Sequence, residues 1–147
     1  MFPNIKITLI EPTLKRCNFL NLVINELGLK DIEVINARAE EYIKEKRETF
    51  DTVTARAVAP LNILLELSIP FLKVDGVFLA MKGSNATDEV KEASHAYHTL
   101  NARIDKEYIF NLMIQPIHLL LYTILIQRSM FLCGGVTKNK ISRKFLA

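Results

Sequence analysis

The sequence predicts an α/β fold in which one parallel β-sheet is covered by helices. Short, apolar, β-branched segments alternate four times with segments whose apolar residues recur at helical spacing. The connections between them are short, and 147 residues with 50% hydrophobic side chains suit one globular domain. Such an alternation is typical of parallel strands joined by right-handed crossover helices.

The predicted strands are short runs rich in isoleucine, valine and threonine. Four are expected in one parallel sheet and a fifth at its edge: Ile5–Ile10, Ile32–Ile35, Thr52–Ala55, Val77–Met81 and Arg103–Phe110. Asp75 and Gly76 are predicted to form the turn that leads into the fourth strand.

The predicted helices fill the intervals between the strands. The first opens after Pro12 and ends at Gly28, because glycine is common directly after a helix. Ala37–Lys46 is expected to be a short charged helix or a turn, and the other helices are expected at Pro60–Leu72 and Ala86–Leu100. Helices are expected on both faces of the sheet.

The character of the sequence changes after Asn111. Leu112–Ile126 carries no charge and is interrupted by Pro116, and a basic segment then ends the chain. We interpret this apolar run either as a last strand or as sequence outside the fold. A membrane span is disfavoured, because it needs roughly 20 apolar residues. We therefore divide the chain into a domain of residues 1–111 and an atypical apolar and basic tail of residues 112–147.

Composition narrows the function classes only slightly. The net charge of +3 and the pI near 8.9 permit RNA binding without arguing for it. Cys17 and Cys133 are far apart, so neither a disulfide framework nor a zinc site is expected. The N-terminus lacks a signal-peptide pattern, and a cytoplasmic location is the default expectation.

In parallel α/β sheets, ligands bind outside the carboxyl ends of the strands. Glu11 follows the first strand, where a carboxylate accepts hydrogen bonds from both hydroxyls of a ribose; stabilisation of a helix N-terminus is the alternative. The small residues around Ala39, followed by Glu40, let backbone amides approach a flat ring such as a purine; a helix start with acidic residues in its first turn is the alternative.

Two cations follow the third and fourth strands. Arg56 lies among small apolar residues, so it needs a carboxylate, a phosphate or backbone carbonyls; a structural salt bridge is the alternative to a ligand. Lys82 is expected at the same edge of the sheet, where two cations could meet an anionic backbone such as RNA.

The strand ends together resemble the bacterial 16S ribosomal RNA guanine-N7 methyltransferase family, also called glucose-inhibited division protein B. The resemblance covers roughly Phe2 to Leu112. The residues that carry it are ITLIEPTLKRCNFL, ARAEE, FDTVTARAVAPL and GVFLAMKG, and TARAVA with ARAEE at this spacing is the most specific pair.

The resemblance implies a Rossmann-like methyltransferase fold that uses S-adenosylmethionine. It assigns the ribose of this cofactor to Glu11, the adenine to the backbone of Ala39 and Glu40, and a cofactor or substrate contact to Arg56. It implies no metal.

The resemblance also implies 16S ribosomal RNA or the small ribosomal subunit as partner. Lys15 and Arg16 match a basic pair that could reach RNA phosphate, and Lys82 would line the acceptor side. Guanine N7 exposes a lone pair, so methyl transfer needs alignment more than a general base, and no catalytic residue is assigned.

The family's first strand and glycine-rich loop would precede Met1, so the resemblance implies an incomplete methyltransferase fold with weak or no binding of S-adenosylmethionine. The alternative is a non-catalytic RNA- or protein-binding remnant of that fold, in which Lys15, Arg16, Lys82 and the basic tail bind the partner.

Overall fold

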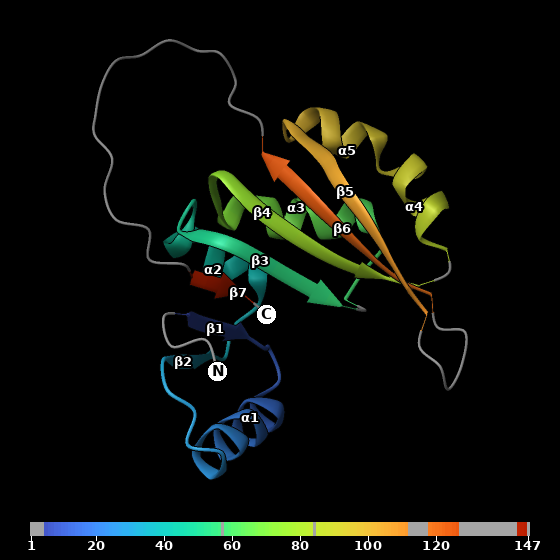
Figure 1. The fold of residues 1–147 in the computed structure, drawn as a ribbon. Helices are drawn as coiled ribbons and strands as arrows, with labels where there is room; N and C mark the ends of the chain where they lie inside the picture. Colours follow the sequence, from blue (N-terminus) through green and yellow to red (C-terminus); the bar gives the residue numbers. More distant parts are fainter. Residues whose placement is uncertain (1–4, 57, 84, 112–117, 127–143, 147) are drawn as a thin grey trace.

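A computed structural model describes residues 5–56, 58–83, 85–111, 118–126 and 144–146. These residues form one seven-stranded sheet with helices packed on it (Figure 1). The strands are β1 (Lys6–Ile10), β2 (Ile32–Ile35), β3 (Phe50–Arg56), β4 (Leu72–Lys82), β5 (Ala102–Asn111), β6 (His118–Ile126) and β7 (Lys144–Leu146).

The strand order is β2-β1-β7-β3-β4-β6-β5. β2, β1, β7, β3 and β4 pair in parallel, which confirms the prediction that the first four strands share one parallel sheet. β6 is antiparallel to both β4 and β5, and β5 forms the predicted edge.

The tail contributes two strands to this sheet. β6 confirms the interpretation of the apolar run as a strand over His118–Ile126. β7, only three residues long, lies between β1 and β3, so these two strands do not pair with each other. Residues 112–117, 127–143 and 147 lie outside the described part of the chain.

The helices are α1 (Leu14–Glu26), α2 (Ala39–Lys46), α3 (Leu61–Ser68), the 3-10 helix η1 (Ile69–Phe71), α4 (Ala86–Glu92) and α5 (Ser94–Thr99). Gly28 follows α1 with a φ of 58°, in the left-handed region that glycine tolerates best. The single helix predicted over Ala86–Leu100 is wrong, because the chain leaves helical geometry at Ala93, where α4 ends and α5 begins.

Four of these helices cover one face of the sheet. α2, α3, α4 and α5 lie on the same side in Figure 1, and α3 packs against α2, α4 and α5. α1 packs against β2. Because β1 to β2 and β3 to β4 step along the sheet in opposite directions, right-handed crossovers put α1 and α3 on opposite faces.

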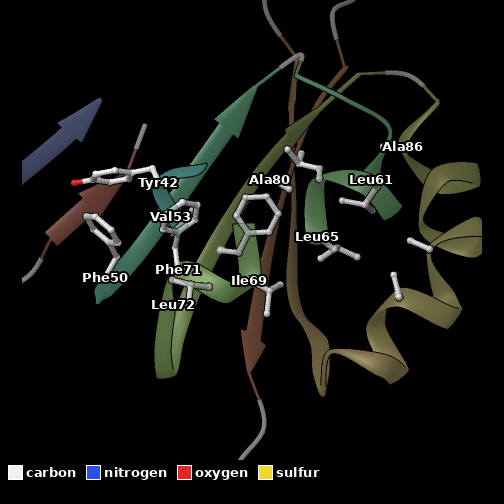
Figure 2. Close-up of a cluster of buried hydrophobic side chains, with 14 residues drawn as sticks. Tyr42, Phe50, Val53, Leu61, Leu65, Ile69, Phe71, Leu72, Ala80 and Ala86 are labelled. Carbon is white, nitrogen blue, oxygen red and sulfur yellow. The ribbon is translucent and has the colours of Figure 1, made fainter. Parts of the chain in front are cut away.

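The hydrophobic core lies between the sheet and α2–α5. Figure 2 shows Phe71 from η1 among side chains of β3, β4 and α3. The Phe71 ring centroid is 5.9 Å from that of Phe50 and 6.1 Å from that of Tyr42. On the opposite face, side chains such as Val77 and Leu79 are half-exposed, and α1 exposes Phe19 and other large apolar residues.

β4 is longer than predicted and contains an irregularity. The register with β3 shifts between the pairs Phe50–Leu72 and Thr52–Val77, so the predicted Asp75–Gly76 turn lies inside the strand as a bulge. A Cβ at Gly76 would be 2.7 Å from the Lys73 carbonyl oxygen, which explains why glycine is needed there.

Among the described helices, none is both long and apolar enough to cross a membrane.

Candidate functional site

A cavity of about 480 Å³ opens at the carboxyl ends of β1 and β3. Its volume lies in the range of small-molecule sites, roughly 300–1,000 Å³. Apolar side chains form most of its wall, and the lining residues are Ile10, Ala39, Val53, Thr54, Ala55, Arg56, Val58, Leu64, Leu67, Ser68, Phe71 and Met81. Its position agrees with the rule that ligands of parallel sheets bind outside the carboxyl ends of strands.

The cavity brings together residues that are far apart in the sequence, from Ile10 to Met81. Ile10 ends β1, Ala39 begins α2, and Arg56 ends β3. The Arg56 side chain is exposed, and no carboxylate among the described residues forms an ion pair with it. Its guanidinium therefore keeps its donors available for a ligand at the cavity.

Glu11 lies directly after Ile10, beside the cavity. One carboxylate oxygen accepts a hydrogen bond of 2.8 Å from the Thr13 backbone N–H, and the other lies 3.5 Å from Arg16 Nη1. The Thr13 hydrogen bond, helped by the charge of Arg16, lowers the pKa of the Glu11 carboxyl below its ordinary value of 4.5. The carboxylate is thus ionised at neutral pH, and its four lone-pair sites leave room for further donors.

Asn36 fixes the end of β1 against the end of β2. Its side-chain amide donates to the Glu11 and Pro12 carbonyl oxygens, each at 3.0 Å. The buried Cys17 thiol donates to the Glu11 carbonyl as well, at 3.1 Å. Sequence reasoning did not assign Asn36 a role; its position directly after a strand was the available signal.

The N-terminus of α2 faces the same region. α2 begins at Ala39 after Arg38, and Glu40 and Glu41 lie in its first turn. The first N–H groups of a helix have no partner within the helix. Those of Ala39 and Glu40 are therefore suited to bind a hydrogen-bond acceptor, although the Glu40 side chain does not line the cavity.

The basic pair at the start of α1 is exposed. Lys15 and Arg16 both lie in the first turn, and Arg16 is 74% exposed. The contact of Arg16 with Glu11 is an exposed ion pair, which contributes little to stability and breaks readily.

Lys82 differs from the other predicted site residues because it is buried. It is 8% exposed, and its ammonium lies 2.7 Å from Glu89 Oε2 and donates to the Ala59 carbonyl oxygen at 2.8 Å. The RNA-side role predicted for Lys82 needs an exposed ammonium. The structure places this group in the interior, and nothing in the sequence of the polar helix α4 singled out its partner Glu89.

No group of three or more histidine, cysteine, aspartate or glutamate side chains in the described part of the chain is arranged to hold a metal ion.

Residues 1–112 match the family model described as rRNA small subunit methyltransferase G (GidB). The chain is 50% identical over 107 residues to ribosomal RNA small subunit methyltransferase G of Fusobacterium nucleatum, which spans 73% of this chain and 46% of that protein. It is 47% identical over 108 residues to the protein of the same name from a Thermoanaerobacter species, spanning 72% of this chain and 45% of that protein.

Among solved structures, the chain is similar to M. jannaschii TYW2 in complex with AdoMet. The TM-score is 0.64 at 13% identity, and the match covers 82% of this chain and 58% of that one. At this identity the likeness concerns the fold alone, and it confirms the predicted Rossmann-like methyltransferase fold.

The chain spans about half the length of the curated relatives it matches. The family match nevertheless covers most of its residues, including Glu11, Ala39, Glu40 and Arg56. The chain therefore belongs to the rRNA small subunit methyltransferase G family.

Proposed function

We propose that this chain carries part of the active site of a methyltransferase that modifies N7 of a guanine in 16S ribosomal RNA, with S-adenosylmethionine as methyl donor. The observation that supports the proposal most is the cavity at the carboxyl edge of the sheet, which joins Ile10, Ala39 and Arg56 in a chain of this family. The finer points, namely the position N7 and the residue roles, rest on the resemblance and on the geometry below.

The residues at the cavity fit a nucleoside. Its apolar wall suits a flat base, and the first N–H groups of α2 are donors for acceptor nitrogens on the edge of that base. Glu11, ionised and fixed by Thr13 and Asn36, would accept hydrogen bonds from the ribose hydroxyls. Arg56 would bind a carboxylate or phosphate at the mouth of the cavity, because its guanidinium is exposed and unpaired among the described residues.

The chemistry needs little from the protein beyond alignment. S-adenosylmethionine, when bound, would supply an electrophilic methyl group. The guanine N7 lone pair would form the new N–C bond while the S–C bond breaks and leaves its electron pair on sulfur. No proton is abstracted from N7, which explains why a site without a general base is sufficient. The protein residues hold the two reactants in line and exclude water.

Lys15 and Arg16 are the proposed contacts with RNA phosphate. They lie at the start of α1, directly after Glu11, and both are exposed. Phosphate contacts position an RNA without reading its sequence. This pair would therefore orient the substrate relative to the site and leave the choice of guanine to other contacts.

Methyl transfer from radiolabelled S-adenosylmethionine to small ribosomal subunits lacking the modification tests the proposal. Label is expected in 16S RNA at a level well below that of a full-length relative, because the chain spans about half the length of the relatives it matches. Chromatography of the digested nucleosides should show N7-methylguanosine. Arg56→Ala should lower S-adenosylmethionine binding or methyl transfer at least tenfold, equivalent to about 1.4 kcal/mol. As an exposed substitution it should change the free energy of unfolding by less than about 0.5 kcal/mol.

Three results would count against this assignment. A different modified nucleoside would refute the N7 position alone. Equal binding and transfer after Arg56→Ala would make this residue a structural cation. RNA binding without any S-adenosylmethionine binding would favour the non-catalytic alternative.

A further inference from the structure

The ion pair between buried Lys82 and half-buried Glu89 is anchored to the segment Val58–Leu61, which leads into α3. Lys82 ends β4 and Glu89 lies on α4, and their charged atoms are 2.7 Å apart. Both side chains also bind the backbone of that segment. The Lys82 ammonium donates to the Ala59 carbonyl oxygen, and the Glu89 carboxylate accepts a hydrogen bond of 2.8 Å from the Leu61 backbone N–H.

These contacts provide hydrogen-bond partners for backbone groups of the segment that have no partner within the segment itself. Leu61 is the first residue of α3, and the first N–H groups of a helix lack partners within it. Proline at position 60 has no N–H, and the cap residue of α3 makes no side-chain hydrogen bond. Glu89 therefore caps α3 from another helix, and its negative charge lies at the favourable end of the α3 dipole.

The same segment forms one wall of the cavity. Val58, which is 63% exposed, lines the cavity next to Arg56, and Leu64 and Leu67 of α3 line it further on. The position of this wall relative to β3 depends on where the segment from Val58 to Leu61 is held.

We propose that Lys82 and Glu89 are positioning residues that hold Val58 and the start of α3 in place as a wall of the nucleoside cavity. The expected consequence, weaker binding of the ligand when the pair is lost, rests on the proposed function. Lys82 is assigned a role through the Ala59 backbone and through Glu89, which binds the Leu61 backbone, and not through contact with RNA.

The burial of the pair supports a positioning role over a stabilising one. The side chains are 7% and 25% exposed. Removing two charges from water costs free energy that their attraction only partly returns, so replacing a whole buried pair by apolar side chains is often neutral or stabilising. What apolar residues cannot replace here is the pair of hydrogen bonds to Ala59 and Leu61.

The double variant Lys82→Met with Glu89→Leu tests this distinction in the full chain. Its melting temperature should stay within a few degrees of the parent, because no unpaired charge is left inside. Amide hydrogen exchange at Leu61, followed by NMR, should become roughly tenfold faster or more, since its hydrogen bond is lost. Titration with S-adenosylmethionine should show a dissociation constant raised by about tenfold or more, a change of about 1.4 kcal/mol.

The exposed pair on the same helix provides the matched control. Asp88 and Lys91 lie 3.5 Å apart and are 78% and 74% exposed. Asp88→Asn with Lys91→Met also removes one negative and one positive charge, both from the exposed side of α4, and should leave both the Leu61 exchange rate and the dissociation constant unchanged.

A second variant keeps the test decisive if the double variant fails to fold. The single variants Glu89→Gln and Glu89→Leu differ in one respect: the glutamine side chain supplies an amide oxygen that can accept from the Leu61 N–H, and the leucine side chain supplies no acceptor. Exchange at Leu61 should therefore be slower in Glu89→Gln than in Glu89→Leu. Equal exchange and equal ligand binding in the parent and the double variant would overturn the inference. Faster exchange with unchanged binding would also overturn it, by showing a local structural role. If the parent does not bind S-adenosylmethionine even at millimolar concentration, the proposed function fails for this chain, while exchange at Leu61 still decides whether the pair holds the segment.

Discussion

Filling the cavity from Ala39 separates ligand binding from stability. Ala39 is half-buried, begins α2 and lines the cavity. Ala39→Leu adds three carbon atoms that have empty space beside them in a cavity of about 480 Å³. Full burial of the three added carbon atoms would raise the free energy of unfolding by about 2.4 kcal/mol, at roughly 0.8 kcal/mol for each atom. Half-burial would raise it by about 1 kcal/mol.

The expected result is a protein that is slightly more stable and no longer binds the nucleoside. For a chain of this size, 1 kcal/mol corresponds to about 3 °C in the melting temperature. The leucine side chain would occupy the space proposed for the base, so binding of adenosine or S-adenosylmethionine should fall by at least tenfold. Thermal unfolding followed by circular dichroism and an NMR titration with each ligand measure the two effects.

Ala102→Leu serves as the control. Ala102 is half-buried and packs against the core from β5, but it does not line the cavity. This variant should bind the ligands as the parent does. Undiminished binding by Ala39→Leu would show that the base lies elsewhere. A melting temperature lowered by several degrees would show that the wall around Ala39 cannot accept a larger side chain, and the volume argument would fail.

Three further substitutions test the core, the bulge and the strand end. Phe71→Ala removes a fully buried ring and should cost about 3–5 kcal/mol in urea unfolding, whereas Leu22→Ala on the exposed side of α1 should cost less than about 0.5 kcal/mol. Gly76→Ala should be destabilising because its Cβ would meet the Lys73 carbonyl, whereas Gly83→Ala has open space and should be tolerated; differential scanning calorimetry compares the two. For Glu11, the lowered pKa means that its contribution to stability is present above about pH 4.5 and is lost as the pH falls through the folded-state pKa. Glu11→Gln should therefore lower the urea midpoint at pH 7, and its difference from the parent should shrink toward pH 3.

The sequence predicted the secondary structure best in segments where the local hydrophobic pattern and the packing in the folded chain favour the same element. β2 has the predicted bounds, and β1 and β3 differ from the predictions by a few residues at their ends. Short runs rich in β-branched apolar residues and bounded by polar residues indicate strands wherever in the sheet they lie. The break at Ala93 had no such signal. Ala93 is fully buried, and its neighbours carry no proline or glycine that would mark the end of a helix.

The insertion of β7 between β1 and β3 could not be predicted from local sequence. Three residues from the end of the chain pair with strands more than 90 positions away, and nothing in their composition indicates parallel pairing. Partner choice in a sheet depends on which edges are available after the rest of the chain has folded. This information lies in the arrangement of all strands rather than in any one segment.

Lys82 and Arg56 test the rule that ligands of a parallel sheet bind outside the carboxyl ends of its strands. They show that the rule places the backbone correctly but does not say to which face of the strand a side chain points. Both are cations at the carboxyl ends of adjacent parallel strands, and the rule correctly places both backbones at one edge. Side chains alternate between the two faces of a strand, however, and in the observed register Arg56 lies beside Met81. Lys82 therefore shares the face of Phe78 and Ala80, which are both fully buried under the helices. Val77 to Met81 are all apolar, so the sequence alone does not show which parity faces the core. The inward direction of Lys82 follows from its parity with Phe78 in the structure. A cation at a strand end is thus a candidate ligand contact only when its side chain lies on the face of the strand away from the core. A cation on the core-facing side must instead pair with a carboxylate, as Lys82 does with Glu89.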